Sequence, residues 1–402
     1  MKDKIVLIDT IVTKDNSKKT RVWVTILSLF FFIGIITDPF SVIRANDYDT
    51  TRIFKAMAKA RRGEDIVVGV IGGSITKGYA ASTESKRWAN LVADWWKTTF
   101  PNSNITFINA GIGGTGSDIG THRVQHDLLK CKPDFIVVEF SVNDTEGEYA
   151  EKMMEGLIRQ ILVDTNHPGV MMLMLKQSDG TTAQACHKLV ANHYKVPYVS
   201  FADLIDDAVA ADGIRLDSIY IDGLHTVDIG MAYIAKFISN ELDSIYKNLP
   251  ANSDIKAVDA TLPDPLITDV YAHTFMYDSR NIVPSSNKGW KTAGITWESE
   301  TPGSQINFEV KGTAISILYS RHNYSNGGKA DVWVDDGAHI TLDAYWDQTW
   351  GPAMVFQLVQ EGLGGGTHML HIKILEDHNA ATNGNYFKVL NVLKAGNIDL
   401  AD

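Results

Sequence analysis

The sequence IVVGVIGGSIT, residues 66–76, is the strongest indication of the fold, because the pattern of a buried strand leads directly into a pair of glycines. Residues 66–71 form a short, continuous apolar run, which is typical of a parallel strand covered by helices on both faces. Gly72 and Gly73 let the chain turn sharply, and Ser74 follows at or near the start of a helix. We therefore expect Ser74 at the carboxyl edge of a parallel sheet, where the functional loops of such sheets lie.

The same alternation of strands and helices continues along the region 46–250. Further apolar strand patterns occur at 105–109, 135–140, 170–175 and 198–201. Helical patterns occur at 52–62, 85–99, 117–130, 147–162, 181–194 and 227–246. Repeated strand–helix–strand units imply right-handed crossovers, so this region is predicted to be a flavodoxin-like α/β/α domain with a parallel sheet.

The sequence changes character near Pro250. Residues 251–265 contain the Pro, Asp, Asn and Ser residues that are typical of a linker. Beyond them the helical period disappears, and strand patterns separated by Gly-rich and Asn-rich turns occur at 305–310, 314–319, 330–335, 369–375 and 386–393. Residues 266–402 are therefore predicted to form an all-β sandwich of jelly-roll type.

The first 45 residues indicate export. Basic residues up to Arg21 precede a mainly apolar run at 22–36, which is the pattern of a secretory signal. The run is shorter than the roughly 20 residues that span a bilayer comfortably. The leader before it is long, however, and residues 43–45 make a poor cleavage site, so a cleaved signal peptide and an uncleaved membrane anchor both stay open. Either one places the rest of the chain outside the cytoplasm.

The overall charge and the cysteines narrow the partners. The 402-residue chain is 45% hydrophobic, with a net charge of −11 and a pI of about 5.5. An acidic chain of this kind is not expected to bind nucleic acid or an anionic membrane surface. No motif predicts a metal or an organic cofactor. Cys131 and Cys186 either pair in an oxidising compartment or remain free thiols.

Polar residues follow the other predicted strands at the same edge of the sheet. The second strand leads into the glycine-rich segment 109–114, and the third leads into Ser-Val-Asn-Asp at 141–144. Asp222 and His225 come directly before the last predicted helix. A carboxylate three residues before a histidine can accept from the imidazole Nδ1, which leaves Nε2 free to take the proton of a serine. We therefore expect a serine, a base and a carboxylate to face one cleft.

These loops, in this order, resemble the four sequence blocks of the SGNH/GDSL hydrolase family. The resemblance covers about residues 64–245. The family's nucleophile matches Ser74, and its Asp-x-x-His pair matches Asp222 and His225. The resemblance implies ester hydrolysis without a cofactor: Ser74 attacks an ester carbonyl, His225 acts as general base, and water then hydrolyses the acyl-enzyme.

The resemblance also implies an oxyanion hole, to which the nucleophile's own N–H contributes. The family's oxyanion-hole glycine matches Gly114 and its asparagine matches Asn143, while Gly113 stays a competitor because a one-residue shift exchanges the two glycines. Two positions depart from the family pattern. Gly73 stands where the family commonly has Asp, and Ser141 stands where it commonly has Gly. Neither departure removes a catalytic atom, but both loosen an assignment of subfamily.

The substrate class rests on resemblance. The Gly-Gly-Ser-Ile-Thr block, the expected export and the sandwich together look like the carbohydrate-esterase branch of the family. The implied substrate is an acetylated polysaccharide or oligosaccharide, from which acetate is released. Trp346 and Trp350 lie in an aromatic loop at 345–350 and are the candidates for binding sugar rings.

Two other functions stay open. A lipase or thioesterase would need an apolar acyl channel, which the sequence does not identify. A non-catalytic cell-surface carbohydrate-binding protein would keep the fold without the chemistry, and the intact Ser74, Asn143 and Asp222–His225 argue against it. Among the remaining polar residues near the cleft, Asp144 is expected to cap the helix that follows it.

Overall fold

The structure, a computed structural model, describes residues 48–252, 255 and 257–396. The segment that predicts export, residues 1–45, lies outside the described residues. Within the described part of the chain, no helix is long and apolar enough to cross a membrane.

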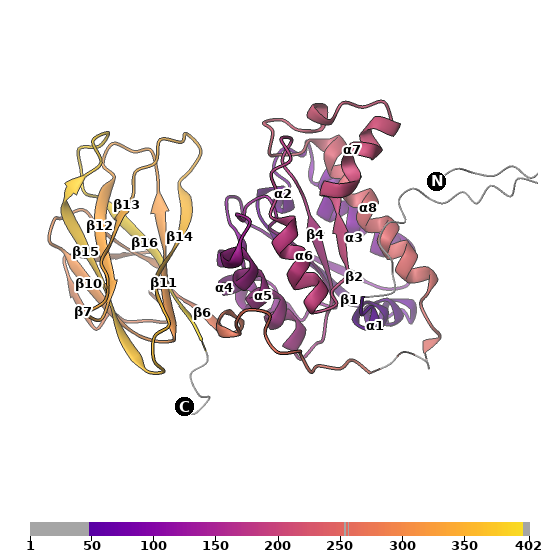
Figure 1. Cartoon of the computed structure of the whole chain (residues 1–402), viewed down its shortest axis with the longest axis horizontal. Helices are drawn as coiled ribbons and strands as arrows, with labels where there is room; N and C mark the ends of the chain where they lie inside the picture. Colours follow the sequence, from indigo (N-terminus) through magenta and orange to yellow (C-terminus); the bar gives the residue numbers. More distant parts are fainter. Residues whose placement is uncertain (1–47, 253–254, 256, 397–402) are drawn as a thin grey trace, which may run out of the picture. The chain divides into compact units, whose positions relative to one another are not determined.

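A five-stranded parallel sheet forms the centre of the first domain (Figure 1). The strand order is β2-β1-β3-β4-β5, so β1 lies between β2 and β3. The strands are β1 (Ile66–Gly72), β2 (Ile105–Gly111), β3 (Phe135–Glu139), β4 (Gly169–Met174) and β5 (Tyr198–Ser200). The predicted parallel α/β fold is confirmed.

Helices cover both faces of this sheet because its strands carry apolar side chains on both sides (Figure 1). The α-helices are α1 (Thr51–Arg61), α2 (Ser74–Lys77), α3 (Trp88–Thr99), α4 (Ser117–Asp127), α5 (Glu148–Val163), α6 (Gln184–His193), α7 (Phe201–Ala211) and α8 (Asp228–Lys247). Ile66 and Val70 pack into one hydrophobic core with Trp88 and Trp96, whereas Ile71 packs into the core on the opposite face.

One of these helices escapes prediction. The sequence pattern predicts a strand that ends at Phe201, but β5 ends at Ser200 and α7 begins at Phe201. The Ser200 Oγ accepts a hydrogen bond from the Asp203 N–H at 3.1 Å, so Ser200 is the N-cap of α7. The apolar residues on both sides of this serine conceal the boundary.

The second domain is an antiparallel sandwich of two sheets, as predicted (Figure 1). One sheet has the order β13-β12-β15-β10-β7, and the other has the order β14-β11-β16-β9-β8, with β6 paired to β16. The strands are β6 (Thr274–Tyr277), β7 (Ser286–Lys288), β8 (Lys291–Ala293), β9 (Thr296–Ser299), β10 (Gln305–Lys311), β11 (Ala314–Arg321), β12 (Gly328–Val334), β13 (Ile340–Asp343), β14 (Ala353–Glu361), β15 (Thr367–His378) and β16 (Phe387–Ala395).

Strand β14 shows why part of the sandwich is hard to predict. Its Met354 and Phe356 pack against an apolar cluster that contains Ile119 of α4, in the α/β domain. Both faces of β14 are therefore partly covered, and its sequence lacks the alternation of apolar and polar residues that marks a strand with one face in water.

Two buried polar side chains of α5 attach the start of the sandwich region to the α/β domain. The Glu155 carboxylate accepts hydrogen bonds from the N–H groups of Ile267 and Thr268, both at 2.9 Å. The Gln160 amide donates to the Tyr271 carbonyl and to the Thr274 Oγ1, both at 3.0 Å. Because a buried polar group without partners would be costly, these bonds hold the connecting segment in place.

The two cysteines do not pair. Cys131 is exposed, Cys186 is buried, and both are free thiols. Of the two alternatives for these residues, the structure therefore shows the free thiols.

Candidate active site

The nucleophile turn is built from the end of β1 and a single turn of helix. β1 pairs with β2 as far as Gly72 opposite Gly111, and α2 begins two residues later at Ser74. Gly78 ends this turn of helix in the left-handed conformation, with φ of 93°. Ser74 is 9% exposed and stands at the helix N-terminus, where free N–H groups favour negative charge.

The structure brings Ser74, His225 and Asp222 together. The Ser74 Oγ lies 2.8 Å from the His225 Nε2, and the His225 Nδ1 lies 2.7 Å from the Asp222 Oδ2. When Nδ1 donates to the carboxylate, Nε2 is left without a proton and can accept the one on Ser74. The three-residue spacing of Asp222 and His225 accounts for the contact at Nδ1, and the sheet brings Ser74, 151 positions away in the chain, to Nε2.

The Asp222–His225 segment is a tight loop that orients its own side chains. Gly223 provides the left-handed backbone of the turn, with φ of 81°, and the Ile221 N–H donates to the His225 carbonyl at 2.9 Å. The Asp222 Oδ1 accepts from the N–H groups of His225 and Leu224, at 2.8 and 3.1 Å. The carboxylate is thereby locked to the histidine that it supports.

Hydrogen bonding keeps Asp222 ionised. Partial burial pushes the pKa of Asp222 up, but the bonds from the His225 backbone and ring and from the Leu224 N–H outweigh it and hold the pKa below its ordinary value. The side chain of Asp222 is 46% exposed and that of His225 is 16% exposed. A carboxylate that is ionised in mildly acidic solution can keep the imidazole in one tautomer and support its charged form.

Asn143 and Gly114 lie beside the nucleophile turn. The Asn143 Oδ1 is 2.1 Å from the position that a Cβ on Gly73 would occupy, so the amide packs directly against the residue before Ser74. Gly114 has a φ of 70°, and a Cβ on it would lie 3.4 Å from the ring of Trp350. A Cβ on Gly113 would lie 3.7 Å from the Ser74 Cβ, so both glycines are next to the site and the choice between them stays a prediction.

A pocket of about 300 Å³ adjoins these residues. The α/β domain contributes Gly114, Asp118, Asn143 and Tyr149, and the sandwich contributes an aromatic and apolar wall that includes Trp346, Trp350, Met354 and Phe356. The pocket therefore offers hydrogen-bonding groups on one side and apolar groups and aromatic rings on the other, as small-molecule pockets commonly do.

Ring contacts and Arg321 hold the aromatic loop, residues 345–350, in place. The Trp346 and Trp350 rings meet edge to face, with centroids 4.5 Å apart. The Arg321 guanidinium lies 5.6 Å from the centre of the Trp346 ring and donates to the Tyr345 carbonyl at 2.9 and 3.2 Å. Trp350 remains 53% exposed, so its ring is free to contact a ligand.

Arg123 supports the site although the sequence does not reveal it. Its guanidinium is buried and donates to the Gly72 carbonyl at 3.0 Å and to the Ala110 carbonyl at 2.7 Å. It thereby ties the ends of β1 and β2, just before the nucleophile turn and the glycine loop. An arginine within a helical pattern predicts a solvent-exposed side chain, so no local signal identifies this role.

Tyr79 is a further residue at the site. Its ring centroid lies 4.4 Å from that of His225, and the side chain is 58% exposed. The Tyr79 N–H donates to the Ser74 carbonyl at 3.0 Å, so the nucleophile turn itself carries the ring that lies against the histidine. Its position shortly after the serine is the only sequence signal that indicates a place in the cleft.

Glu139, the last residue of β3, is a buried carboxyl group that contacts the nucleophile helix α2 through Thr76. It accepts a hydrogen bond from the Thr76 Oγ1 at 3.1 Å. Burial raises the pKa of Glu139 to about 7, the hydroxyl of Thr76 opposes this rise, and the negative charge of Asp144 adds to it. The folded protein therefore favours the neutral form of Glu139 well above the pH at which an exposed glutamate ionises.

This raised pKa predicts a pH dependence of stability. Between pH 4.5 and about pH 7 the folded state holds a proton on Glu139 that the unfolded state loses, so this group's contribution to the stability falls as the pH rises through that window. Glu139→Gln removes the titration. The Tm difference, variant minus wild type, is expected to be more positive at pH 8 than at pH 5. Calorimetry at both pH values measures it, and an equal difference at both would contradict the assignment.

The described residues contain no group of three or more His, Cys, Asp or Glu side chains that could hold a metal ion. His122 and His126, which lie one helical turn apart on α4, have separate environments. His122 is buried against Phe356, and His126 bonds Asp127 near the surface.

A parallel α/β sheet with a serine, a histidine and an aspartate in hydrogen-bond contact at its carboxyl edge is the arrangement of a serine hydrolase. Residues 70–233 match the model of the GDSL-like lipase/acylhydrolase family. Two crystal structures of a two-domain esterase (CEX) active on acetylated mannans are also similar, one of them with mannopentaose. They are 30% and 31% identical to this chain, with TM-scores of 0.78 and 0.76, and each match covers 87% of this chain and 96% of that one.

The chain belongs to the GDSL-like lipase/acylhydrolase family and is a carboxylic ester hydrolase. A further relative is the uncharacterized lipoprotein YqeF of Bacillus subtilis (strain 168), to which the chain is 32% identical over 101 residues. That match spans 23% of this chain and 39% of the lipoprotein.

Proposed function

We propose that this hydrolase removes acetyl groups from a polysaccharide or oligosaccharide outside the cytoplasm. The esterases with the same two domains are active on acetylated mannans, which supports an acetylated glycan as the substrate. The similarity to a lipoprotein and the export pattern in the first 45 residues support the location.

In the proposed mechanism Ser74 is the nucleophile. His225 Nε2 takes the hydroxyl proton across the 2.8 Å contact as the Ser74 Oγ attacks the acetyl carbonyl carbon. The charge that forms on the imidazole is stabilised by Asp222 through the 2.7 Å contact at Nδ1.

The oxyanion forms next to the three expected donors. These are the N–H groups of Ser74 and Gly114 and the side-chain amide of Asn143. The intermediate then collapses, His225 gives its proton to the sugar oxygen that leaves, and the acetyl group remains on Ser74. Water, deprotonated by the same histidine, releases acetate and restores the serine.

One observation carries the choice of a sugar ester: the ring of Trp350 lies beside Gly114. A sugar ring stacked on Trp350 would hold an acetyl group on that sugar beside the glycine loop and Asn143. The nearby Asp118 and Tyr149 line the same pocket and offer partners for sugar hydroxyl groups. A pocket of about 300 Å³ with these polar groups fits an acetylated sugar better than a long acyl chain.

Replacing Trp350 with alanine tests this proposal. The change should lower kcat/KM for acetate release from acetylated mannan about tenfold more than kcat/KM for 4-nitrophenyl acetate, because only the glycan stacks on the ring. Both rates are measured on the full chain, one by acetate assay and one by absorbance.

The matched control is Phe275→Ala, which removes another exposed aromatic ring of the sandwich outside the pocket. In Phe275→Ala the ratio of kcat/KM for acetylated mannan to kcat/KM for 4-nitrophenyl acetate should equal that of the wild type. Equal losses on both substrates in Trp350→Ala, or wild-type turnover of 4-nitrophenyl octanoate that exceeds turnover of the acetate, would contradict the proposal. The second result would favour a lipase.

A further inference from the structure

The three expected oxyanion donors come from loops that follow three different strands. Ser74 lies after β1, Gly114 lies after β2 and Asn143 lies after β3. β2 and β3 each pair with β1, and the strand order places them on opposite sides of it. The hydrogen bonds between strands therefore position the Gly114 loop and the Asn143 loop each relative to the nucleophile turn. β2 and β3 do not pair with each other, so no strand pairing positions the Gly114 loop relative to the Asn143 loop.

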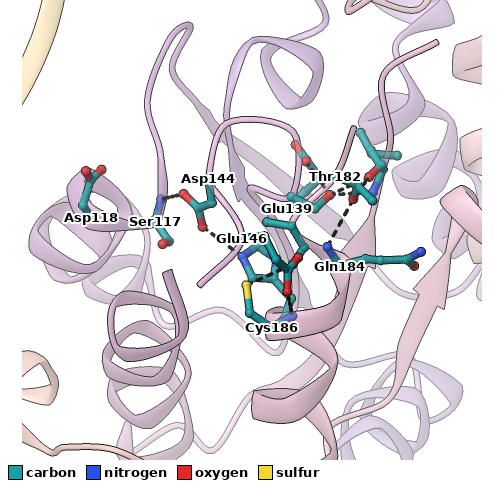
Figure 2. Close-up of polar contacts among 12 residues, drawn as sticks. Ser117, Asp118, Glu139, Asp144, Glu146, Thr182, Gln184 and Cys186 are labelled. Atoms are coloured by element: carbon teal, nitrogen blue, oxygen red, sulfur yellow. Dashed lines mark hydrogen bonds and ion pairs between the residues drawn. The ribbon is translucent and has the colours of Figure 1, made fainter. Parts of the chain in front are cut away.

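Asp144 supplies the missing connection (Figure 2). Its Oδ1 accepts a hydrogen bond at 2.8 Å from the N–H of Ser117, the first residue of α4, which directly follows the glycine loop. Asp144 therefore caps α4, and the expectation that it caps the helix after it is wrong. A carboxylate at this end of α4 also meets the positive end of the helix dipole.

The second carboxylate oxygen is held from the other side. The Asp144 Oδ2 lies 2.9 Å from the Nε2 of His187 on α6. The two side chains are 6% and 1% exposed. Because a buried carboxylate is stable only when its oxygens have partners, Asp144 has little freedom to move. Gly116 permits the close approach, since a Cβ there would lie 2.6 Å from the Asp144 Oδ1.

Asp144 and Asn143 are held by the same backbone turn. The N–H groups of both residues donate to the Phe140 carbonyl at 3.0 Å, so they share one turn at the end of β3. The Asn143 Oδ1 is buried and has no hydrogen-bond partner among the described residues, so the turn and the packing against Gly73 determine where the amide lies.

We infer that Asp144 is a positioning residue, which sets the spacing between the Asn143 amide and the Gly114 N–H by bridging Ser117 and His187. This inference rests on the proposed function, since it concerns the oxyanion hole of that reaction. Losing the bridge lets the two loops drift apart. A misplacement of about 1 Å can cost on the order of 100-fold in rate.

The first test is the hydrolysis of 4-nitrophenyl acetate by Asp144→Ala. Its kcat should fall about tenfold to 100-fold while KM stays within about twofold, because the loss appears only when the oxyanion forms. Gly116→Ala should lower kcat in the same way with Asp144 still present, because the new methyl group displaces the carboxylate from Ser117.

The matched control is Glu146→Ala. Glu146 is a carboxylate of the same loop that accepts from the N–H of Cys186 in α6, but it makes no bond to the glycine loop (Figure 2). Glu146→Ala should keep the wild-type kcat. A fall as large as that of Asp144→Ala would show a general loss of loop structure and would overturn the inference.

A double-mutant cycle separates positioning from folding. In an Asn143→Ala background, where the amide is already gone, Asp144→Ala should lower kcat by no more than about twofold further. If the separate losses of kcat in Asp144→Ala and Asn143→Ala multiplied fully in the double variant, the inference would be overturned. A wild-type kcat in Asp144→Ala alone would overturn it as well. If Asp144→Ala does not fold, the same cycle with Gly116→Ala decides. A wild type without esterase activity, or one unaffected by loss of Ser74, would instead contradict the proposed function.

Discussion

Ser74→Ala is expected to lower kcat for 4-nitrophenyl acetate by at least about 10³-fold, to the background left by the oxyanion hole and substrate binding. The reason is geometric. The Ser74 Oγ is the hydroxyl that lies 2.8 Å from the His225 Nε2, and removing it leaves the base with nothing to activate by direct contact. Absorbance of released nitrophenol measures the rate, and a thermal melt confirms that the variant folds.

The control for this variant is Ser103→Ala. Ser103 lies before β2, at the amino end of the sheet, where its hydroxyl donates to the Glu64 carbonyl. It should keep the wild-type rate. If Ser74→Ala retained a substantial part of the activity while folded, another group would have to be the nucleophile.

Gly73→Ala is expected to lower kcat by about 10²-fold to 10³-fold, which is the usual cost of losing one oxyanion donor. The added Cβ would lie 2.1 Å from the Asn143 Oδ1, so the amide must move away. Gly73 has a φ of −86°, which any residue can adopt, so the backbone itself is not strained. KM for 4-nitrophenyl acetate should change little, because the amide acts when the oxyanion forms.

One of the two departures from the family pattern lies at this contact. Many members carry Asp before the nucleophile, whereas this chain carries Gly73. Here an aspartate would occupy the space of the Asn143 amide, so Gly73→Asp should lose at least as much activity as Gly73→Ala. Gly364→Ala, where a Cβ meets open space, is the control. A Gly73→Ala variant with wild-type kcat would show that Asn143 is not an oxyanion donor.

Much of the site could be predicted because its signals are local. The run from Ile66 into the glycine turn predicts a strand that ends at Ser74. The three-residue spacing of Asp222 and His225 lets one short loop hold both the imidazole and the carboxylate that it contacts. In both cases the residues that form the local structure are neighbours in the chain, so a short sequence pattern is enough to predict it.

The supporting residues could not be predicted because their partners are distant in the chain. Asp144 meets residues 27 and 43 positions away, and Arg123 meets the Gly72 carbonyl 51 positions away. No periodicity or turn signal encodes such contacts, since they arise only when the strands and helices of the domain pack together. The same reason conceals β14, whose outer face is covered by another domain.

The most direct test is mass spectrometry of the peptide that contains Ser74, acid-quenched while the full chain turns over acetylated mannan. The predicted result is release of acetate together with one acetyl group on Ser74. Release of acetate with no acetyl group on this serine, or with the acetyl group on another residue, would contradict the mechanism. No release of acetate would contradict the substrate.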